Sequence, residues 1–134
     1  MIKGIGHIAF RVADLERSLN FYCNILGLKE AFRLYSDTGE LWIVYIKINK
    51  DNFIELFPYK GEVSSNYDKA SYQHLCLVVD EINATLKELS ERGLEVKGTP
   101  THGKDGNYQY WITDPDGNMI ELMQIMPDSL QAKA

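Results

Sequence analysis

Residues 7–27 read HIAFRVADLERSLNFYCNILG, and residues 73–93 read QHLCLVVDEINATLKELSERG. Each stretch begins with an apolar run typical of a strand and continues into a segment whose apolar residues recur at helical spacing. An aspartate precedes each predicted helix and a glycine follows it, as is typical of helix starts and stops. These residues are Asp14 and Gly27 in the first stretch, and Asp80 and Gly93 in the second. The chain therefore contains one strand–helix unit twice.

The spacing of other residues extends this repeat over most of the chain. Glu55 and Glu121 lie 66 positions apart, as do the two aspartates, whereas His7 and His74 lie 67 positions apart. Further strand signals follow each helix, with the turn sequence DPDGN before the last of them. They are LWIVYIKIN and NFIELF in the first half, and YQYWIT and NMIELMQ in the second. Each half thus predicts a strand, a helix and three strands, which is an α+β class.

The length of 134 residues fits one domain with internal repetition. We predict a first module over about residues 4–58, a polar connector over about 59–71 and a second module over about 72–126. The residues after Met126 are expected to fray.

Composition excludes several classes of function. Hydrophobic residues make up 45% of the chain and charged residues 25%, which is the balance of a globular protein. The net charge of -5 and the absence of a run of Lys and Arg argue against a nucleic-acid partner. No apolar run approaches bilayer length and no leader is evident, so we expect no membrane partner. Cys23 and Cys76 have neither a metal-binding nor a redox spacing, which predicts two reduced core thiols in a cytoplasmic protein.

Two glutamates stand in strands that are otherwise apolar. Alternation places Glu55 on one side of its strand with Phe53 and Phe57, and it places Glu121 with methionines and Ile125. Removing an unpaired carboxylate from water costs several kcal/mol, so such a group is normally paired, protonated or bound to a metal.

Two histidines, His7 and His74, stand near the starts of two other apolar strands. A single strand histidine is usually a satisfied core or rim residue, and a single strand glutamate often lies on an open sheet face. Recurrence in both halves instead favours one divalent ion held by all four side chains. Imidazole and carboxylate suit zinc, nickel, cobalt, iron or manganese. The remaining histidine, His102, has no counterpart and is expected to be exposed.

The sequence resembles the vicinal oxygen chelate superfamily, and within it the small glyoxalase I (lactoylglutathione lyase) type. The likeness covers about residues 4–126 and is carried by GHIAFRVADLERSLNFYCNILGL, FIELF, QHLCLVVDEI and DPDGNMIEL. It implies two tandem βαβββ modules that form a curved half-barrel around the metal, with open coordination positions for two substrate oxygens. It also implies a homodimer whose sites draw ligands from both subunits.

The resemblance further implies a metal-dependent lyase or isomerase that transfers a proton through a metal-bound enediolate. The residue matching Glu121 moves the proton, and the one matching Glu55 is its counterpart across the site. Arg11 and Lys104 match basic residues that contact the substrate. The implied small-molecule substrate is a methylglyoxal–thiol hemithioacetal, although this chain lacks the asparagine that the glyoxalase I type often has near Tyr59.

Other members of the superfamily offer alternatives. One is an epimerase or isomerase of another hydroxycarbonyl or acyl-CoA compound, although that type typically has glutamine in place of Glu55. Extradiol dioxygenases are usually about twice as long, and fosfomycin-modifying transferases lack the first-half glutamate. A drug-binding resistance protein without catalysis would lack metal ligands, so the four-residue set disfavours that class.

Overall fold

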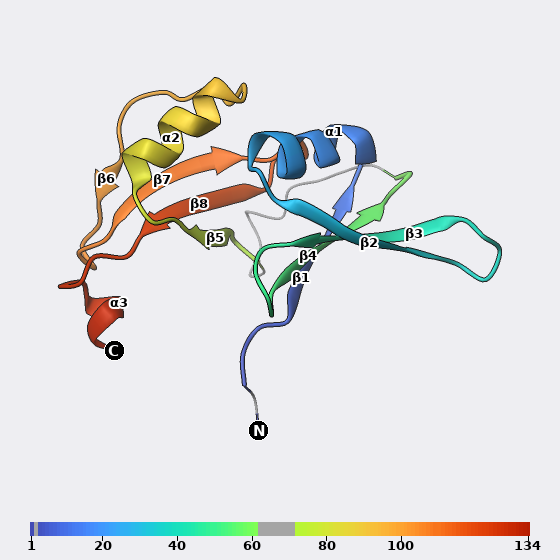
Figure 1. Cartoon of the computed structure of the whole chain (residues 1–134), viewed down its shortest axis with the longest axis horizontal. Helices are drawn as coiled ribbons and strands as arrows, with labels where there is room; N and C mark the ends of the chain where they lie inside the picture. Colours follow the sequence, from blue (N-terminus) through green and yellow to red (C-terminus); the bar gives the residue numbers. More distant parts are fainter. Residues whose placement is uncertain (2, 62–71) are drawn as a thin grey trace. The chain divides into compact units, whose positions relative to one another are not determined.

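The computed structural model describes residues 1, 3–61 and 72–134. It divides into two compact units, unit 1 (Met1–Ser64) and unit 2 (Ser65–Ala134). Each unit contains one four-stranded sheet and a helix that follows the first strand in the chain and packs against the sheet (Figure 1). Most of the predicted connector, residues 62–71, lies outside the described residues.

Unit 1 follows the predicted order of a strand, a helical segment and three strands. Its elements are β1 (His7–Val12), α1 (Leu15–Leu19), η1 (Asn20–Ile25), β2 (Lys29–Tyr35), β3 (Leu41–Lys47) and β4 (Phe53–Pro58). The strands lie in the order β1-β4-β3-β2. The outer strand β1 pairs with β4 in parallel, and the other two pairs are antiparallel.

Unit 2 repeats this arrangement. Its elements are β5 (Leu75–Val78), α2 (Ile82–Glu91), β6 (Thr101–His102), β7 (Tyr108–Thr113), β8 (Met119–Gln124) and the short terminal helix α3 (Leu130–Lys133). The sheet order β5-β8-β7-β6 is the order of unit 1, again with one parallel and two antiparallel pairs. The predicted α+β class and the strand–helix–three-strand order of each half are therefore confirmed.

The helix of unit 1 begins and ends where the sequence indicates. The Asp14 carboxylate accepts a hydrogen bond of 3.0 Å from the backbone N–H of Arg17, which satisfies one of the free donors of the first turn. The helix continues from α1 into η1, a stretch with π-helical hydrogen bonding. Gly27, with a φ of 74°, ends it in the left-handed region that favours glycine.

The cap of the second helix differs from the prediction. Glu81, and not Asp80, is the N-cap residue of α2, and its carboxylate accepts hydrogen bonds from the backbone N–H groups of Asn83 and Ala84. These bonds lower the pKa of Glu81 because they stabilise the charged carboxylate. Gly93, with a φ of 102°, follows the helix as predicted.

Each sheet buries one face against its helix. In unit 1 the buried face carries Phe10, Val12, Val44, Ile46, Ile54 and Leu56. In unit 2 the buried residues of α2 are Ile82, Leu86 and Leu89, and those of the strands are Tyr110, Ile112, Ile120 and Leu122. Burial of these apolar surfaces is the main source of stability of each unit. The opposite face of each sheet carries the polar residues that form the candidate site.

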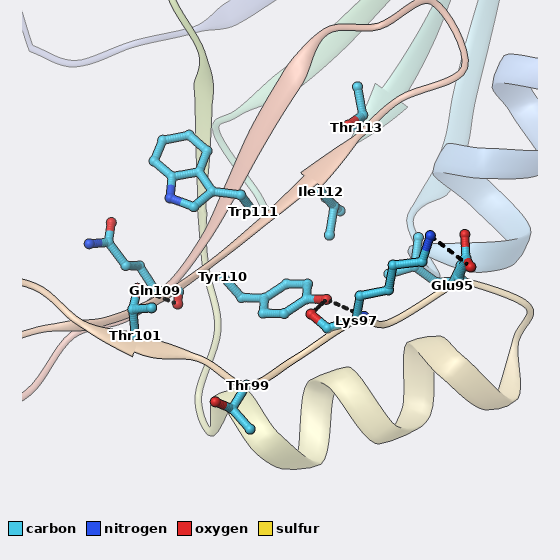
Figure 2. A pocket seen from close by; sticks show the side chains of 10 residues that line it. Glu95, Lys97, Thr99, Thr101, Gln109, Tyr110, Trp111, Ile112 and Thr113 are labelled. Atoms are coloured by element: carbon cyan, nitrogen blue, oxygen red, sulfur yellow. Dashed lines mark hydrogen bonds and ion pairs between the residues drawn. The ribbon is translucent and has the colours of Figure 1, made fainter.

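The outer strand of the second sheet is much shorter than its counterpart in unit 1. Only Thr101 and His102 pair with β7, whereas β2 pairs along the length of β3. Beside the rest of β7 lies an open cleft of about 500 Å³ (Figure 2). The Tyr110 hydroxyl accepts a 2.8 Å hydrogen bond from the Lys97 backbone N–H and donates one of 2.9 Å to the Lys97 carbonyl oxygen. This side chain thus ties the neighbouring segment to the strand.

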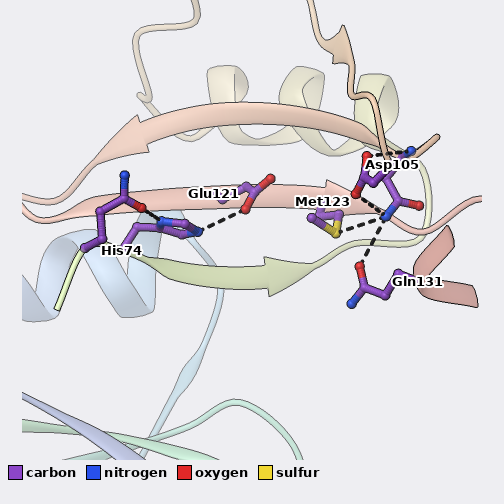
Figure 3. A network of polar contacts seen from close by, with 7 residues as sticks. His74, Asp105, Glu121, Met123 and Gln131 are labelled. Carbon is purple, nitrogen blue, oxygen red and sulfur yellow. Dashed lines mark hydrogen bonds and ion pairs between the residues drawn. The ribbon is translucent and has the colours of Figure 1, made fainter. Parts of the chain in front are cut away.

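The C-terminal residues are ordered, so the expectation of fraying after Met126 is wrong. Asn107 is 1% exposed and its side-chain amide donates to Asp105 at 2.9 Å and to Gln131 at 3.2 Å (Figure 3). Its amide oxygen accepts from the Met126 backbone N–H at 2.9 Å. The short helix α3 is therefore fastened to the sheet by a buried polar residue that sequence spacing does not reveal. None of the helices in the described parts of the chain is long and apolar enough to cross a membrane.

Candidate metal centre

The first histidine and glutamate lie on neighbouring strands of unit 1. The parallel register of β1 and β4 places Ala9 opposite Glu55, so His7 lies diagonally across from the carboxylate. The His7 Nε2 atom is 3.5 Å from Glu55 Oε2. Glu55 is 5% exposed, as alternation predicted, whereas the side chain of His7 is 52% exposed. The pair therefore joins a buried carboxylate to an imidazole that remains open to ligands.

The second histidine and glutamate repeat this arrangement in unit 2. His74 lies just before β5, and its Nε2 atom is 3.2 Å from Oε2 of Glu121, which is also 5% exposed (Figure 3). The other ring nitrogen of His74, Nδ1, contacts the side-chain oxygen of Gln73. The Trp111 ring lies edge-on to the imidazole with centroids 4.7 Å apart. Both neighbours fix the orientation of the imidazole.

Each glutamate has a different neighbour across the sheet. Tyr45 of β3 lies directly opposite Glu55, and its hydroxyl donates a hydrogen bond to that carboxylate. This bond raises the pKa of Tyr45, because ionising the phenol would remove the donor and place two negative charges together. The Tyr45 ring also stacks on Phe32, with centroids 4.3 Å apart. The Glu55 carboxylate is therefore held by both His7 and Tyr45.

Glu121 faces Trp111 where Glu55 faces Tyr45, and it faces a cysteine where Glu55 faces Ala9. Cys76 of β5 lies directly opposite Glu121, and its thiol hydrogen-bonds to the carboxylate. Desolvation of the thiol, followed by the neighbouring negative charge, raises the pKa of Cys76 to about 12. The prediction that both cysteines are core residues is wrong for Cys76, which is exposed on the face of the sheet that carries His74. Cys23 is half-buried, and both thiols are free.

The predicted substrate-binding residues lie in different units. Arg11 is exposed on β1, two positions beyond Ala9, and its guanidinium carbon lies 5.3 Å from the centroid of the Tyr59 ring. This distance is within the range of a cation–π contact. Lys104 is exposed in the turn between β6 and β7 of unit 2. His102 is exposed, as expected, and packs edge-on against Tyr108.

Each unit brings together two of the four predicted metal donors. The structure brings His7 together with Glu55, and His74 together with Glu121. Within the described residues, no group of three or more His, Cys, Asp or Glu side chains is arranged to hold a metal ion. Each unit therefore supplies two donors, whereas zinc in catalytic sites typically takes three protein ligands and ions such as nickel or manganese take more.

Three neighbours of the candidate ligands were not identified as site residues from sequence: Tyr45, Cys76 and Trp111. Each lies on a strand next to a glutamate or histidine and faces the same side of the sheet. Strand alternation assigns a residue to a face but does not give the register between strands. The signal available in the sequence was the repeat itself. Tyr45 and Trp111 lie 66 positions apart, as Glu55 and Glu121 do, which marks them as equivalent positions of the two halves.

The fold and the paired residues together define a class of protein that comparison with known families identifies. Residues 4–122 match the model of the Glyoxalase/Bleomycin resistance protein/Dioxygenase superfamily, and the chain belongs to that superfamily. The predicted resemblance is therefore confirmed at the level of the superfamily.

Individual relatives carry different names. A probable lactoylglutathione lyase of Synechocystis sp. is 32% identical over 123 residues, which cover 88% of this chain and 92% of that protein. The metallothiol transferase FosB of Staphylococcus epidermidis is 32% identical over 128 residues, which cover 90% and 81%. The solved structure of a superfamily member from Sphaerobacter thermophilus has a TM-score of 0.74 at 26% identity, and covers 92% of this chain and 98% of that one.

Proposed function

We propose that this protein is a metal-dependent lyase or isomerase of the glyoxalase I type, which moves a proton between two adjacent carbons of a small hydroxycarbonyl substrate. The observation that carries the proposal is the duplicated pair of a histidine and a buried glutamate, one in each unit. His7, Glu55, His74 and Glu121 would together hold one zinc, nickel, cobalt, iron or manganese ion. When bound, such an ion acts as a Lewis acid that stabilises negative charge on substrate oxygens.

The proton transfer is assigned to Glu121, with Glu55 as its counterpart. Glu121 is 5% exposed and shares its strand face with Met119 and Met123, so its carboxylate is poorly hydrated. Its Oε atoms can take a proton from the carbon next to the carbonyl and return it to the neighbouring carbon. Arg11 and Lys104 are assigned to anionic groups of the substrate.

The proposed substrate is the hemithioacetal of methylglyoxal and a thiol. The supporting observations are the four donors and the relative named lactoylglutathione lyase. The asparagine that the glyoxalase I type often has shortly after the first glutamate is absent from this chain. Tyr59 lies in this region instead and stacks on Arg11. The thiol of the proposed substrate is therefore glutathione or another low-molecular-weight thiol.

A second candidate is thiol transfer to an electrophilic small molecule. The relative named metallothiol transferase, at 32% identity, favours it. The buried Glu55 disfavours it, because transferases of this kind lack the first-half glutamate. The two reactions are separable, since the lyase exchanges a carbon-bound proton of its substrate with solvent and the transferase does not.

We propose that the protein acts as a homodimer. A four-stranded sheet leaves two edge strands with unpaired backbone groups, and a second subunit is a common way of covering them. Light scattering at micromolar concentration is expected to give twice the mass of the chain. A monomer with full activity would exclude ligands shared between subunits.

The test of the metal centre is the metal content of the purified protein and of two histidine variants. We expect about one divalent ion per chain in the wild type and a large loss in His74→Ala, because removing one of four ligands weakens the site greatly. His102→Ala is the matched control, since that histidine is exposed and distant in sequence from the pairs, and it should keep its metal. Equal metal content in all three proteins would overturn the ligand assignment.

The test of the base is turnover in Glu121→Gln with the metal loaded. Glutamine keeps the size and one oxygen donor but removes the basicity, so we expect turnover of the hemithioacetal to fall by roughly 10²-fold or more while the metal is bound somewhat more weakly. If the variant kept near-full turnover, Glu121 would be a ligand alone. Turnover by the wild type no faster than background would leave the metal centre standing and refute the proposed substrate.

A further inference from the structure

Three lysines from two separate stretches of sequence surround one cleft of unit 1. The cleft has a volume of about 310 Å³ and lies where β2 begins and β3 ends. Its lining includes Lys29, Lys47 and Lys50 together with Gly27, Leu28 and Ile48. The sequence alone showed no run of basic residues, so this concentration of positive charge in a chain of net charge -5 is produced by folding.

The pairing of the strands places two of these charges side by side. Lys29 of β2 lies directly opposite Lys47 of β3. Like charges directly opposite each other on neighbouring strands destabilise a sheet. In the described parts of the chain, none of the three lysines forms an ion pair with a carboxylate. A basic residue just after the C-terminus of a helix interacts favourably with the helix dipole. This effect explains a lysine at position 29 but not at positions 47 and 50.

The repeat shows that the fold does not require lysines at these positions. The residues 66 positions later in unit 2 are Glu95, Thr113 and Asp116. Glu95 and Thr113 line the cleft of unit 2, and the Glu95 carboxylate forms a 3.0 Å ion pair with Lys97 (Figure 2). The same place in the second module is therefore neutral to acidic. The positive charge is a feature of unit 1 and not of the architecture.

The register also relates the lysines to the candidate metal centre. Lys29, Lys47, Phe53 and His7 are successive partners in one row across the sheet, and directly paired residues share a face. His7 is thus two strands away from Lys47, and at about 4.8 Å per strand their backbones are roughly 10 Å apart. Phe53 lies between them in this row, which leaves an apolar surface between the lysines and the imidazole.

We propose that this lysine cleft binds a multiply charged anionic group, either a phosphate or a cluster of carboxylates, on a small molecule. An ammonium group acts on such ligands as a point charge with several donors, so three of them neutralise two or three negative charges without requiring one fixed geometry. A bound anion also removes the repulsion between Lys29 and Lys47. Resting on the proposed function, the anion is the end of the substrate remote from the carbon that reacts, because Phe53 lies between Lys47 and His7 in the row of paired residues.

The experiment is calorimetric titration of the full-length protein with inorganic pyrophosphate and, separately, with citrate, at low ionic strength. The cleft variant is K29Q/K47Q/K50Q, and the control is K3Q/K87Q/K133Q, which removes the same charge from exposed lysines elsewhere. We expect one saturable site per chain, at least tenfold weaker binding in the cleft variant and less than twofold change in the control. Tighter binding of pyrophosphate identifies a phosphate ligand, and tighter binding of citrate identifies clustered carboxylates.

Two results would overturn the proposal: no saturable binding of either anion by the wild type, or equal weakening in both triple variants. Amide chemical shifts of Gly27, Leu28 and Ile48 in the wild type give an independent measurement that does not depend on the folding of a variant. They should move on titration, and their constancy would also refute the site. The same titration in His74→Ala separates this proposal from the metal centre, because the anion should still bind after the metal has been lost.

Discussion

Replacing Tyr45 with phenylalanine should weaken metal binding through Glu55 without removing any ligand. The Tyr45 hydroxyl donates to a carboxylate that is 5% exposed, so water replaces the lost hydrogen bond poorly. A hydrogen bond to a charged group contributes about 1.5–3 kcal/mol. Because Tyr45 is half-buried and not fully enclosed, the lower end of this range applies to its hydrogen bond. A loss of about 1.5 kcal/mol corresponds to roughly tenfold weaker binding of the metal. Loss of a partner that orients a metal ligand typically lowers metal affinity 10–100-fold, which agrees with this value.

The measurement is zinc affinity by competition with a chromogenic chelator. Tyr35→Phe is the matched control, because Tyr35 lies on β2 of the same sheet and is 59% exposed. We expect about tenfold weaker binding in Tyr45→Phe and no change in Tyr35→Phe. An affinity within twofold of the wild type in Tyr45→Phe, in a protein where His74→Ala loses its metal, would refute the role of Tyr45 while keeping the metal centre.

Two further changes test the caps and the thiol. Asp14→Ala should lower stability by about 0.5–2 kcal/mol, measured by thermal denaturation, because it removes the acceptor for the Arg17 N–H, while Asp14→Asn should keep most of the stability. An equal loss in the two variants would show that this hydrogen bond is not what stabilises the start of the helix. In metal-free Cys23→Ser protein at pH 8.5, Cys76 should react with iodoacetamide roughly 30-fold more slowly than an ordinary thiol. Raising the pKa of the thiol from 9.0 to about 12 lowers the thiolate fraction by about 10³. The higher pKa also makes the remaining thiolate more nucleophilic, which offsets part of this loss. Glu121→Gln removes the neighbouring charge and should accelerate this reaction, and an unchanged rate would contradict the contact between the two side chains.

The elements of both halves were predictable because their signals are local. Alternation placed Glu55 and Glu121 on faces with large apolar neighbours, and both carboxylates are buried. Capping chemistry located the first helix, and Gly27 and Gly93 marked the two helix ends. These features depend on the conformational preferences of a few adjacent residues, so a single sequence contains them.

The predicted cap Asp80 was wrong because the repeat was aligned at the wrong residue. With Glu81 as the cap, the interval from histidine to cap is seven residues in both halves, from His7 to Asp14 and from His74 to Glu81. The extra residue of the first half then lies inside the helix. That helix contains the π-helical stretch Asn20–Ile25, and wider π-helical turns accommodate one more residue than α-helical turns over the same length.

The neighbours of the candidate ligands could not be predicted because they depend on strand register. Tyr45 and Cys76 are separated from their glutamates by 10 and 45 positions in the chain, yet both lie directly opposite them. Pairing of two strands is set by packing over the whole sheet, so a shift of one residue would turn either side chain to the other face. For the same reason, the gathering of Lys29 and Lys47 is visible only after folding.

The repeat supplies two equal carboxylates, and their different neighbours support giving them different roles. Both glutamates contact a histidine, but Glu55 also accepts a hydrogen bond from a phenol, which is a strong donor. Glu121 accepts from the thiol of Cys76, which is a weak donor. A carboxylate that must take up a proton is hindered by each strong hydrogen bond that fixes its charged form. The residue with the weaker donor is therefore better suited to act as the base, and the residue with the stronger donor to remain a ligand, which is the division of roles proposed for Glu121 and Glu55.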